Sequence, residues 1–336
     1  MADRRAATAT SDPGLFETLV GDGRPMLFVV ALSLLFAGGF ALFLSASRQF
    51  LPQDLSFLRM TPDELCRVSG CRVVDFMIHD RVAFGGSLMA VGLLYLWLTA
   101  FPLSRGEGWA WWTILVSGGL GFAGFLTYLG YGYLDTWHGM GTLLLAPLLA
   151  VGLARSRGLL LGDRRLRAMI RAPTPWEGWD GRSGLGRSLM LAASLGMAAS
   201  GAVIMFIGVT QVFVPQDLGF MQTTRAALDS VNPRIVPLLA HDRAGFGGAV
   251  LTTGLTTAVC LWFARPSRSL RQTLVLAWAT ASLTAVGIHL IVGYTEPVHV
   301  APAALGAAVF LAGLILAAPS MREAAEGDRP APRELG

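Results

Sequence analysis

The chain has 336 residues, of which 53% are hydrophobic and only 14% are charged, and its formal net charge is +4. Soluble domains usually carry about 25% charged residues, so this composition excludes an ordinary soluble protein and indicates a lipid bilayer as the environment. The mean hydropathy of +0.55 agrees with that interpretation. No nucleic-acid partner is expected.

Eight stretches of the chain contain no Asp, Glu, Lys or Arg, and each is about as long as the roughly 20 residues that cross a hydrocarbon core. In chain order they are 25–47, 82–104, 108–134, 136–154, 188–216, 244–264, 272–295 and 297–321. The sequence therefore predicts an all-α integral membrane protein with eight transmembrane helices.

Three short motifs occur once in each half of the chain. They are Pro-Gln-Asp-Leu at 52–55 and 215–218, His-Asp-Arg at 79–81 and 241–243, and Gly-Tyr followed by a histidine at 132–138 and 293–299. Repetition in the same order indicates a tandem duplication. We therefore predict two tandem-duplicated four-helix bundles, a first repeat over 25–154 with outer loop 48–81 and a second over 188–321 with outer loop 214–243.

The distribution of arginine predicts the orientation in the membrane. Eight arginines lie in the connection 155–187, which the positive-inside rule places in the cytoplasm. Tails 1–24 and 322–336 then lie on the same side, and the second of these is expected to be disordered. The prediction is a multi-pass protein of the cell membrane with both termini cytoplasmic.

Four of the five histidines occupy duplicated positions: His79, His138, His241 and His299. We place all four near the outer face, where the loops enter the spans. Within each half, two imidazoles on neighbouring helix ends are expected to converge, as needed to hold an iron ion between two axial nitrogens. The alternative is an amphipathic cap at the membrane interface. His289 has no counterpart and is expected to be a buried polar residue.

Residues beside these histidines predict an amphiphilic ligand. Arg81 and Arg243 are candidates to bind its carboxylates, such as heme propionates, unless they only pair with the aspartates next to them. The glycine pairs 85–86 and 247–248 offer bare backbone against which a flat ligand would lie.

The first half carries features that the second half lacks. Cys66 and Cys71 lie in its outer loop, where a disulfide can form outside the cytoplasm, either structural or redox-active. Asp75 lies four residues before His79, and Pro237 takes the matching place in the second half. If only one half performs chemistry, we expect it to be the first, with Asp75 as the candidate catalytic residue.

Eight spans in two halves, the four duplicated histidines and a cysteine pair confined to the first outer loop resemble heme A synthase. The resemblance implies that His79 and His138 bind the substrate heme and that His241 and His299 ligate a heme b cofactor. It also implies oxidation of a heme methyl group, and partners in respiratory-chain assembly. Transmembrane electron transfer by bound heme is a related expectation.

Two other classes of function stay open at this point. One is a small-molecule or ion transporter built from parallel four-helix repeats, although no ionisable residue except His289 lies well inside a span. The other is a non-catalytic membrane scaffold whose outer loops bind a partner protein. A homo-oligomer is compatible with each of them.

Overall fold

The structure is a computed structural model that describes residues 14–126, 130, 132–133, 136–171, 176 and 178–327. The regular elements in these residues are all helices. Eight helices are long: α2 (Arg24–Ala46), α5 (Arg72–Ala100), α6 (Gly108–Leu126), α7 (Thr136–Ser156), α9 (Gly181–Val209), α12 (Ile235–Phe263), α13 (Arg268–Val292) and α14 (Pro297–Gly327).

Seven of these helices are long and apolar enough to cross a bilayer, which makes the chain an all-α membrane protein. The exception is α6, which has 19 residues and corresponds to the first part of the predicted span 108–134. Most of the positions after Leu126 in that span lie outside the described residues. Eight spans therefore remain a prediction.

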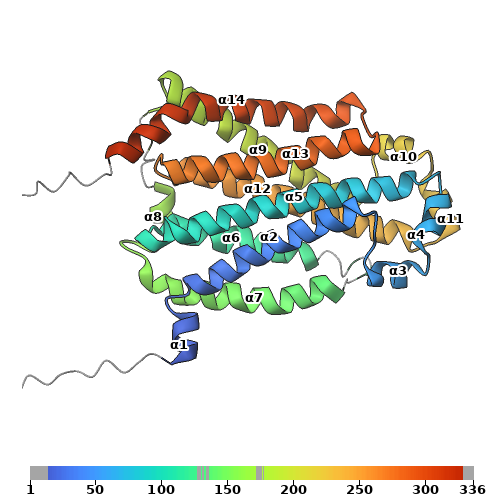
Figure 1. The fold of residues 1–336 in the computed structure, drawn as a ribbon, viewed down its shortest axis with the longest axis horizontal. Helices are drawn as coiled ribbons and strands as arrows, with labels where there is room; N and C mark the ends of the chain where they lie inside the picture. Colours follow the sequence, from blue (N-terminus) through green and yellow to red (C-terminus); the bar gives the residue numbers. More distant parts are fainter. Residues whose placement is uncertain are drawn as a thin grey trace, which may run out of the picture.

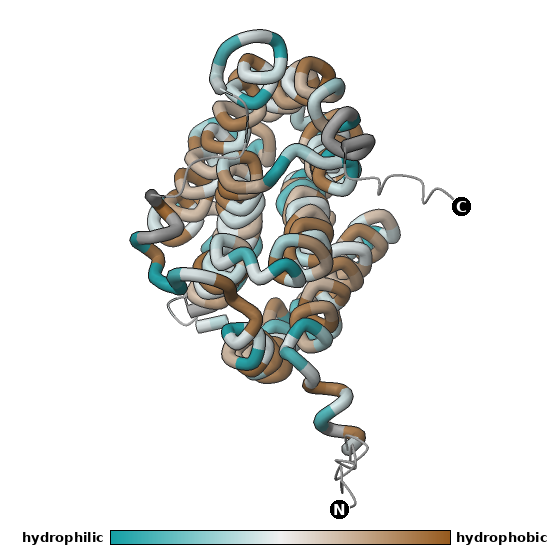
Figure 2. Tube along the Cα trace, turned by 90° about the vertical axis from the view of Figure 1, so that its left-hand side faces the viewer, coloured by the Kyte–Doolittle hydropathy of each residue, from teal (hydrophilic) through white to brown (hydrophobic). Residues whose placement is uncertain are grey.

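The short helices gather at the two ends of the long ones. Figure 1 shows α3 (Pro52–Leu58), α4 (Pro62–Arg67), α10 (Pro215–Met221) and α11 (Arg225–Val231) at the right-hand end. Helices α1 (Leu15–Val20) and α8 (Leu166–Arg171) lie at the opposite end, where α14 also finishes. Two 3-10 turns, Leu103–Arg105 and Arg157–Leu159, complete the described elements. Viewed from the α8 end, the most hydrophilic segments lie mainly in the connections (Figure 2).

Two helices of 29 residues, α5 and α12, occupy the centre of the protein and pack against each other. Helix α5 also packs against α2 and α13, and α12 against α9 and α6. The second long helix of each half therefore contacts the third long helix of the other half. The halves are thus interlocked, in the sense that helices of one half pack between helices of the other. This packing differs from the two separate bundles that were predicted, each made by one half.

Glycines allow the backbones of neighbouring helices to approach closely. A Cβ atom on Gly85 would lie 2.8 Å from the carbonyl oxygen of Gly38, and one on Gly247 would lie 2.8 Å from that of Gly201. A Cβ on Gly86 would overlap Thr284 of α13. Gly85, Gly86 and Gly247 therefore make close helix contacts, which contradicts the expectation that a flat ligand lies against them, whereas a Cβ on Gly248 would meet only Sδ of Met205 at 3.8 Å.

Several predicted boundaries move. Helices α5 and α12 begin before the His-Asp-Arg motifs, so the outer connections are 47–71 and 210–234, although α3, α4, α10 and α11 form within them. The linker ends at Asp180, because 181–187 belong to α9. Helix α14 continues through 322–327, and the rest of the predicted disordered tail lies outside the described residues, as do positions 1–13 of the N-terminal tail.

Candidate histidine sites

The duplicated histidines pair across the two halves. His79 on α5 lies with His299 on α14, with ring centres 5.9 Å apart. His241 on α12 lies with His138 on α7, at 5.1 Å. The expectation that His79 pairs with His138, and His241 with His299, is therefore wrong. The reason is the interlocked packing, which gives each central helix neighbours from the other half.

His289 of α13 completes the first of these groups. Its Nε2 atom lies 3.2 Å from Nε2 of His79, and both residues are buried. One ring nitrogen from each of His79, His289 and His299 lies within 4.8 Å of those of the other two. We call this group the three-histidine site. His289 is buried, as expected, but its place beside two other histidines is not predicted, since it has no duplicate and lies in an otherwise apolar span.

Hydrogen bonds fix the tautomers of the two closest imidazoles. Nδ1 of His289 lies 2.8 Å from the carbonyl oxygen of Tyr294, which only accepts, so this nitrogen carries the proton. Nδ1 of His79 lies 2.9 Å from Oδ1 of Asp80 and donates to that carboxylate. Both Nε2 atoms then present lone pairs to each other. Two lone pairs 3.2 Å apart repel each other unless a cation, either a proton or a metal ion, lies between them.

The third imidazole is oriented by Tyr294. The tyrosine hydroxyl donates to Asp217 at 2.9 Å and lies 3.3 Å from Nδ1 of His299. Burial, together with the neighbouring Asp217 carboxylate, raises the pKa of Tyr294 far above its ordinary value, so the hydroxyl keeps its proton. Its oxygen accepts from Nδ1 of His299, which leaves Nε2 of His299 free to bind a ligand. All three imidazoles therefore share the tautomer of metal-bound histidines, with Nδ1–H held by a second partner.

Buried charges around this site do not balance. Arg243 pairs through two nitrogens with Asp217, and its Nε lies 3.6 Å from Oδ2 of Asp80. The side chains of Arg243, Asp80 and Asp217 are at most 4% exposed. Two carboxylates thus face one guanidinium, and an uncompensated buried charge is costly. One further positive charge at the imidazoles would neutralise the group.

A matching group surrounds His241 and His138, and we call it the two-histidine site. Nδ1 of His241 lies 3.1 Å from Asp242, and Arg81 joins Asp242 at 2.8 Å to Asp54 at 2.9 Å. The hydroxyl of Tyr133 donates to Asp54, as Tyr294 does to Asp217. The first site has three imidazoles and the ring of Tyr294, whereas the described residues of this one provide two imidazoles and the ring of Tyr133, 5.0 Å from that of His241.

The arginines of the His-Asp-Arg motifs are held by carboxylates of the protein. Arg81 and Arg243 each bind the aspartate of the Pro-Gln-Asp-Leu motif in their own half and the aspartate beside the histidine of the other half. They were expected to bind ligand carboxylates, and the structure instead uses them to connect the halves. This contact also gives Asp54 and Asp217 a common role, since each caps the first turn of a short helix and binds the arginine of its own half.

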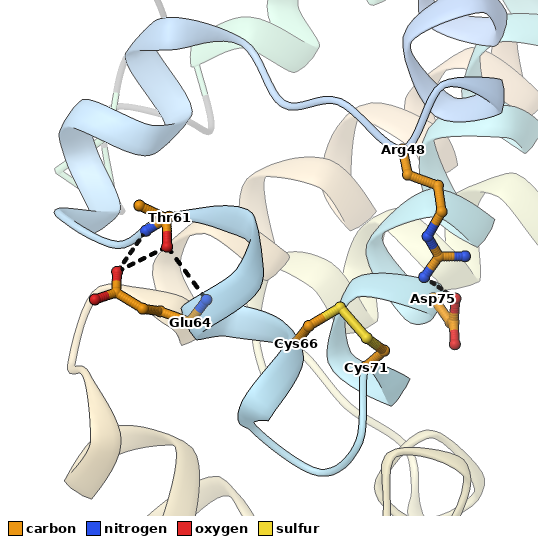
Figure 3. The surroundings of a disulfide bond; sticks show 6 residues. All are labelled: Arg48, Thr61, Glu64, Cys66, Cys71 and Asp75. Carbon is orange, nitrogen blue, oxygen red and sulfur yellow. Dashed lines mark hydrogen bonds and ion pairs between the residues drawn. A yellow bond between two sulfur atoms is a disulfide. The ribbon is translucent and has the colours of Figure 1, made fainter.

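Asp75 and the two cysteines lie at the start of α5. Asp75 binds Arg48 at 2.7 Å, about one helical turn before His79 (Figure 3), and its catalytic role stays a prediction. Cys66 and Cys71 are joined by a disulfide that closes the turn between α4 and α5. Beside it, Thr61 and Glu64 cap α4.

Comparisons of this chain with protein-family models, with curated proteins and with solved structures find no match.

Proposed function

We propose that this protein is a membrane-embedded metalloprotein that binds one first-row transition-metal ion at His79, His289 and His299. The observation that carries the proposal is the facing pair of Nε2 lone pairs of His79 and His289, 3.2 Å apart. Nitrogen ligands about 2.0–2.1 Å from a tetrahedral ion lie about 3.3 Å from each other. Imidazole is a ligand that suits zinc, copper, iron and nickel.

The surroundings support a metal ion rather than a proton alone. A single proton satisfies the pair formed by His79 and His289, but it leaves the lone pair of His299 unused. The carboxylate, the carbonyl and the tyrosine that hold the three Nδ1–H groups are the kinds of second partner that metal-bound histidines have. Among the described residues the group has three members, and three protein ligands leave a fourth position for water or substrate, as in catalytic zinc sites.

A heme is the second candidate, favoured by the way histidines from different helices face each other. The ring centres of His79 and His299, 5.9 Å apart, are compatible with two axial ligands on one iron. The porphyrin ring fits less well than an ion. His289 lies between the two helices, Tyr294 stacks on His299 at 4.4 Å, and neighbouring helices fill the space beside Gly85, Gly86 and Gly247.

The proposal also includes eight spans related by tandem duplication, with both termini in the cytoplasm of the cell. Helix α6 packs against both α12 and α7, which supports an eighth span. The matching motifs make equivalent contacts at both sites, as duplication would produce. Labelling of single cysteines introduced at 22 and 163 from either side of intact cells would test the orientation. Reaction at either position from outside would contradict it.

Elemental analysis of detergent-purified protein tests the metal site. We expect about one transition-metal ion per chain in the wild type, and less than about a tenth of that in His79→Ala and His299→Ala. The matched control is His138→Ala at the two-histidine site, which should keep the ion. Metal-free wild-type protein after incubation with zinc and with copper would overturn the proposal. A Soret band lost in these variants would establish the heme alternative.

A further inference from the structure

A groove between α13 and α14 lies at the end of the protein opposite the histidine sites. Its volume is about 630 Å³. The residues that define it are Arg271, Val275 and Trp278 on α13, and Leu311, Ile315 and Arg322 on α14. Because both helices are candidate membrane spans, the groove opens on a surface that the bilayer would cover.

The groove is apolar along its length and basic at one end. Arg271 lies one turn after the start of α13, and Arg322 is the last residue of the apolar part of α14. From Leu311 to Arg322 the helix rises about 16 Å, roughly half of the 30 Å hydrocarbon core. The dimensions therefore match one leaflet, with the guanidinium groups at the level of the lipid headgroups.

Among the side chains that the structure describes, which on α14 end at Arg322, no carboxylate lies within ion-pairing distance of either arginine. Arg24 and Arg48, by contrast, are paired with Asp22 and Asp75. The wall of the groove is fixed, since the indole N–H of Trp278 donates to the carbonyl oxygen of Ala307 at 3.0 Å. Two guanidinium groups at the mouth of a fixed apolar groove complement an anion attached to an apolar chain.

We propose that this groove binds one anionic phospholipid, with its phosphate at Arg271 and Arg322 and an acyl chain along Val275, Leu311 and Ile315. Basic pockets between spans at the cytoplasmic side of a membrane are suited to anionic headgroups, and guanidinium groups bind phosphate in a bidentate manner. The site is separate from the histidines and does not depend on what they bind.

Native mass spectrometry of the full chain, released from nanodiscs of phosphatidylglycerol or phosphatidylcholine, tests this site. We expect the wild type to retain one phosphatidylglycerol molecule and at least fivefold less phosphatidylcholine. The double variant Arg271→Gln with Arg322→Gln should retain at least fivefold less phosphatidylglycerol than the wild type. Ile315→Trp, which fills the groove and leaves both charges in place, should also lower retention.

Arg268→Gln is the matched control, because Arg268 is an exposed arginine on the same helix that does not line the groove. It should retain lipid as the wild type does. Equal retention of the two lipids, or equal losses in the double variant and in Arg268→Gln, would overturn the proposal. So would a dimer that dissociates in Ile315→Trp, which would show that a second copy of the chain covers the groove. Metal content should not change in any of these variants.

Discussion

The two histidine sites have the same supporting residues but different numbers of imidazoles. In each, a histidine binds the aspartate next to it, an arginine joins two aspartates, and a tyrosine donates to one of them. Only the first has a third imidazole, from His289. The matching position in the first half, 128, holds a tyrosine in the sequence. The repeated motifs therefore form the frame of both sites, and His289, which has no counterpart histidine, gives the first site its third imidazole.

Removing the central arginine of each site should give the largest effect on stability. Arg243→Ala leaves Asp80 and Asp217 buried without a counter-charge, and we expect a loss of about 3–5 kcal/mol in the free energy of unfolding. Arg81→Ala should cost less, because Arg81 is 17% exposed against 4% for Arg243. Urea unfolding in detergent micelles measures both. Equal losses, or a loss no larger than that of the exposed Arg268→Ala, would show that the two networks do not differ in burial as described.

The difference between the sites should disappear when the third imidazole is replaced. His289→Tyr leaves the first site with two imidazoles, and we expect metal affinity to fall at least about 100-fold, or about 2.7 kcal/mol. Isothermal titration with zinc or copper measures the change. His241→Ala removes an imidazole from the other site and serves as the control, with unchanged affinity. If His289→Tyr and His241→Ala lower the affinity equally, both sites contribute to binding the ion, which contradicts the proposed difference between them.

The two tyrosines should have unequal effects on the metal. Tyr294→Phe removes the acceptor for Nδ1 of His299, and loss of such a partner typically costs 10–100-fold in metal affinity. Tyr133→Phe deletes the equivalent hydroxyl from the two-histidine site and should leave affinity unchanged. The same titration gives the result. An identical decrease in both variants would indicate general destabilisation in place of a specific role in orienting His299.

The smallest effects are expected at the caps of the two outer connections. Thr61→Ala and Thr224→Ala each remove a side-chain cap and should cost about 1 kcal/mol. Only the first cap depends on pH. Hydrogen bonds from Thr61 lower the pKa of Glu64, so its stabilisation is present above the ordinary pKa of a glutamate and is lost as the pH falls through the lowered value. The loss in free energy of unfolding caused by Thr61→Ala should be smaller at acidic pH than at neutral pH. The loss caused by Thr224→Ala should be the same at both.

Much of the helical framework follows from the sequence. The apolar stretches predict most of the long helices, and the Pro-Gln-Asp-Leu motif predicts a short helix with proline in its first turn and aspartate near its start, as α3 and α10 have. The beginnings of α5 and α12 were placed too late. The prediction ends each span at the nearest charged residue. The aspartates and arginines of the two His-Asp-Arg motifs instead pair with each other inside the protein, and the helix continues through them.

The candidate site followed from the sequence only in part. Duplication singled out four histidines, and they do lie in two groups, but apolar spans carry little information about which helix packs against which. Pairing across the halves could therefore not be predicted. His289 was missed because a single histidine in an apolar span usually has a structural role. Tyr133 and Tyr294 lie five residues before duplicated histidines in the sequence. The partners of their hydroxyl groups, Asp54 on α3 and Asp217 on α10, are distant in the sequence and are evident only from the structure.

The interlocked packing has a consequence for biosynthesis. His299 lies on the last long helix, whereas its partner His79 lies on the second. The ribosome must therefore synthesise nearly the entire polypeptide before the ligand set exists, and the nascent chain holds His79 and Asp80 in the membrane without their final neighbours. Separate expression of either half would yield neither centre, whereas coexpression of the two halves would be able to rebuild both.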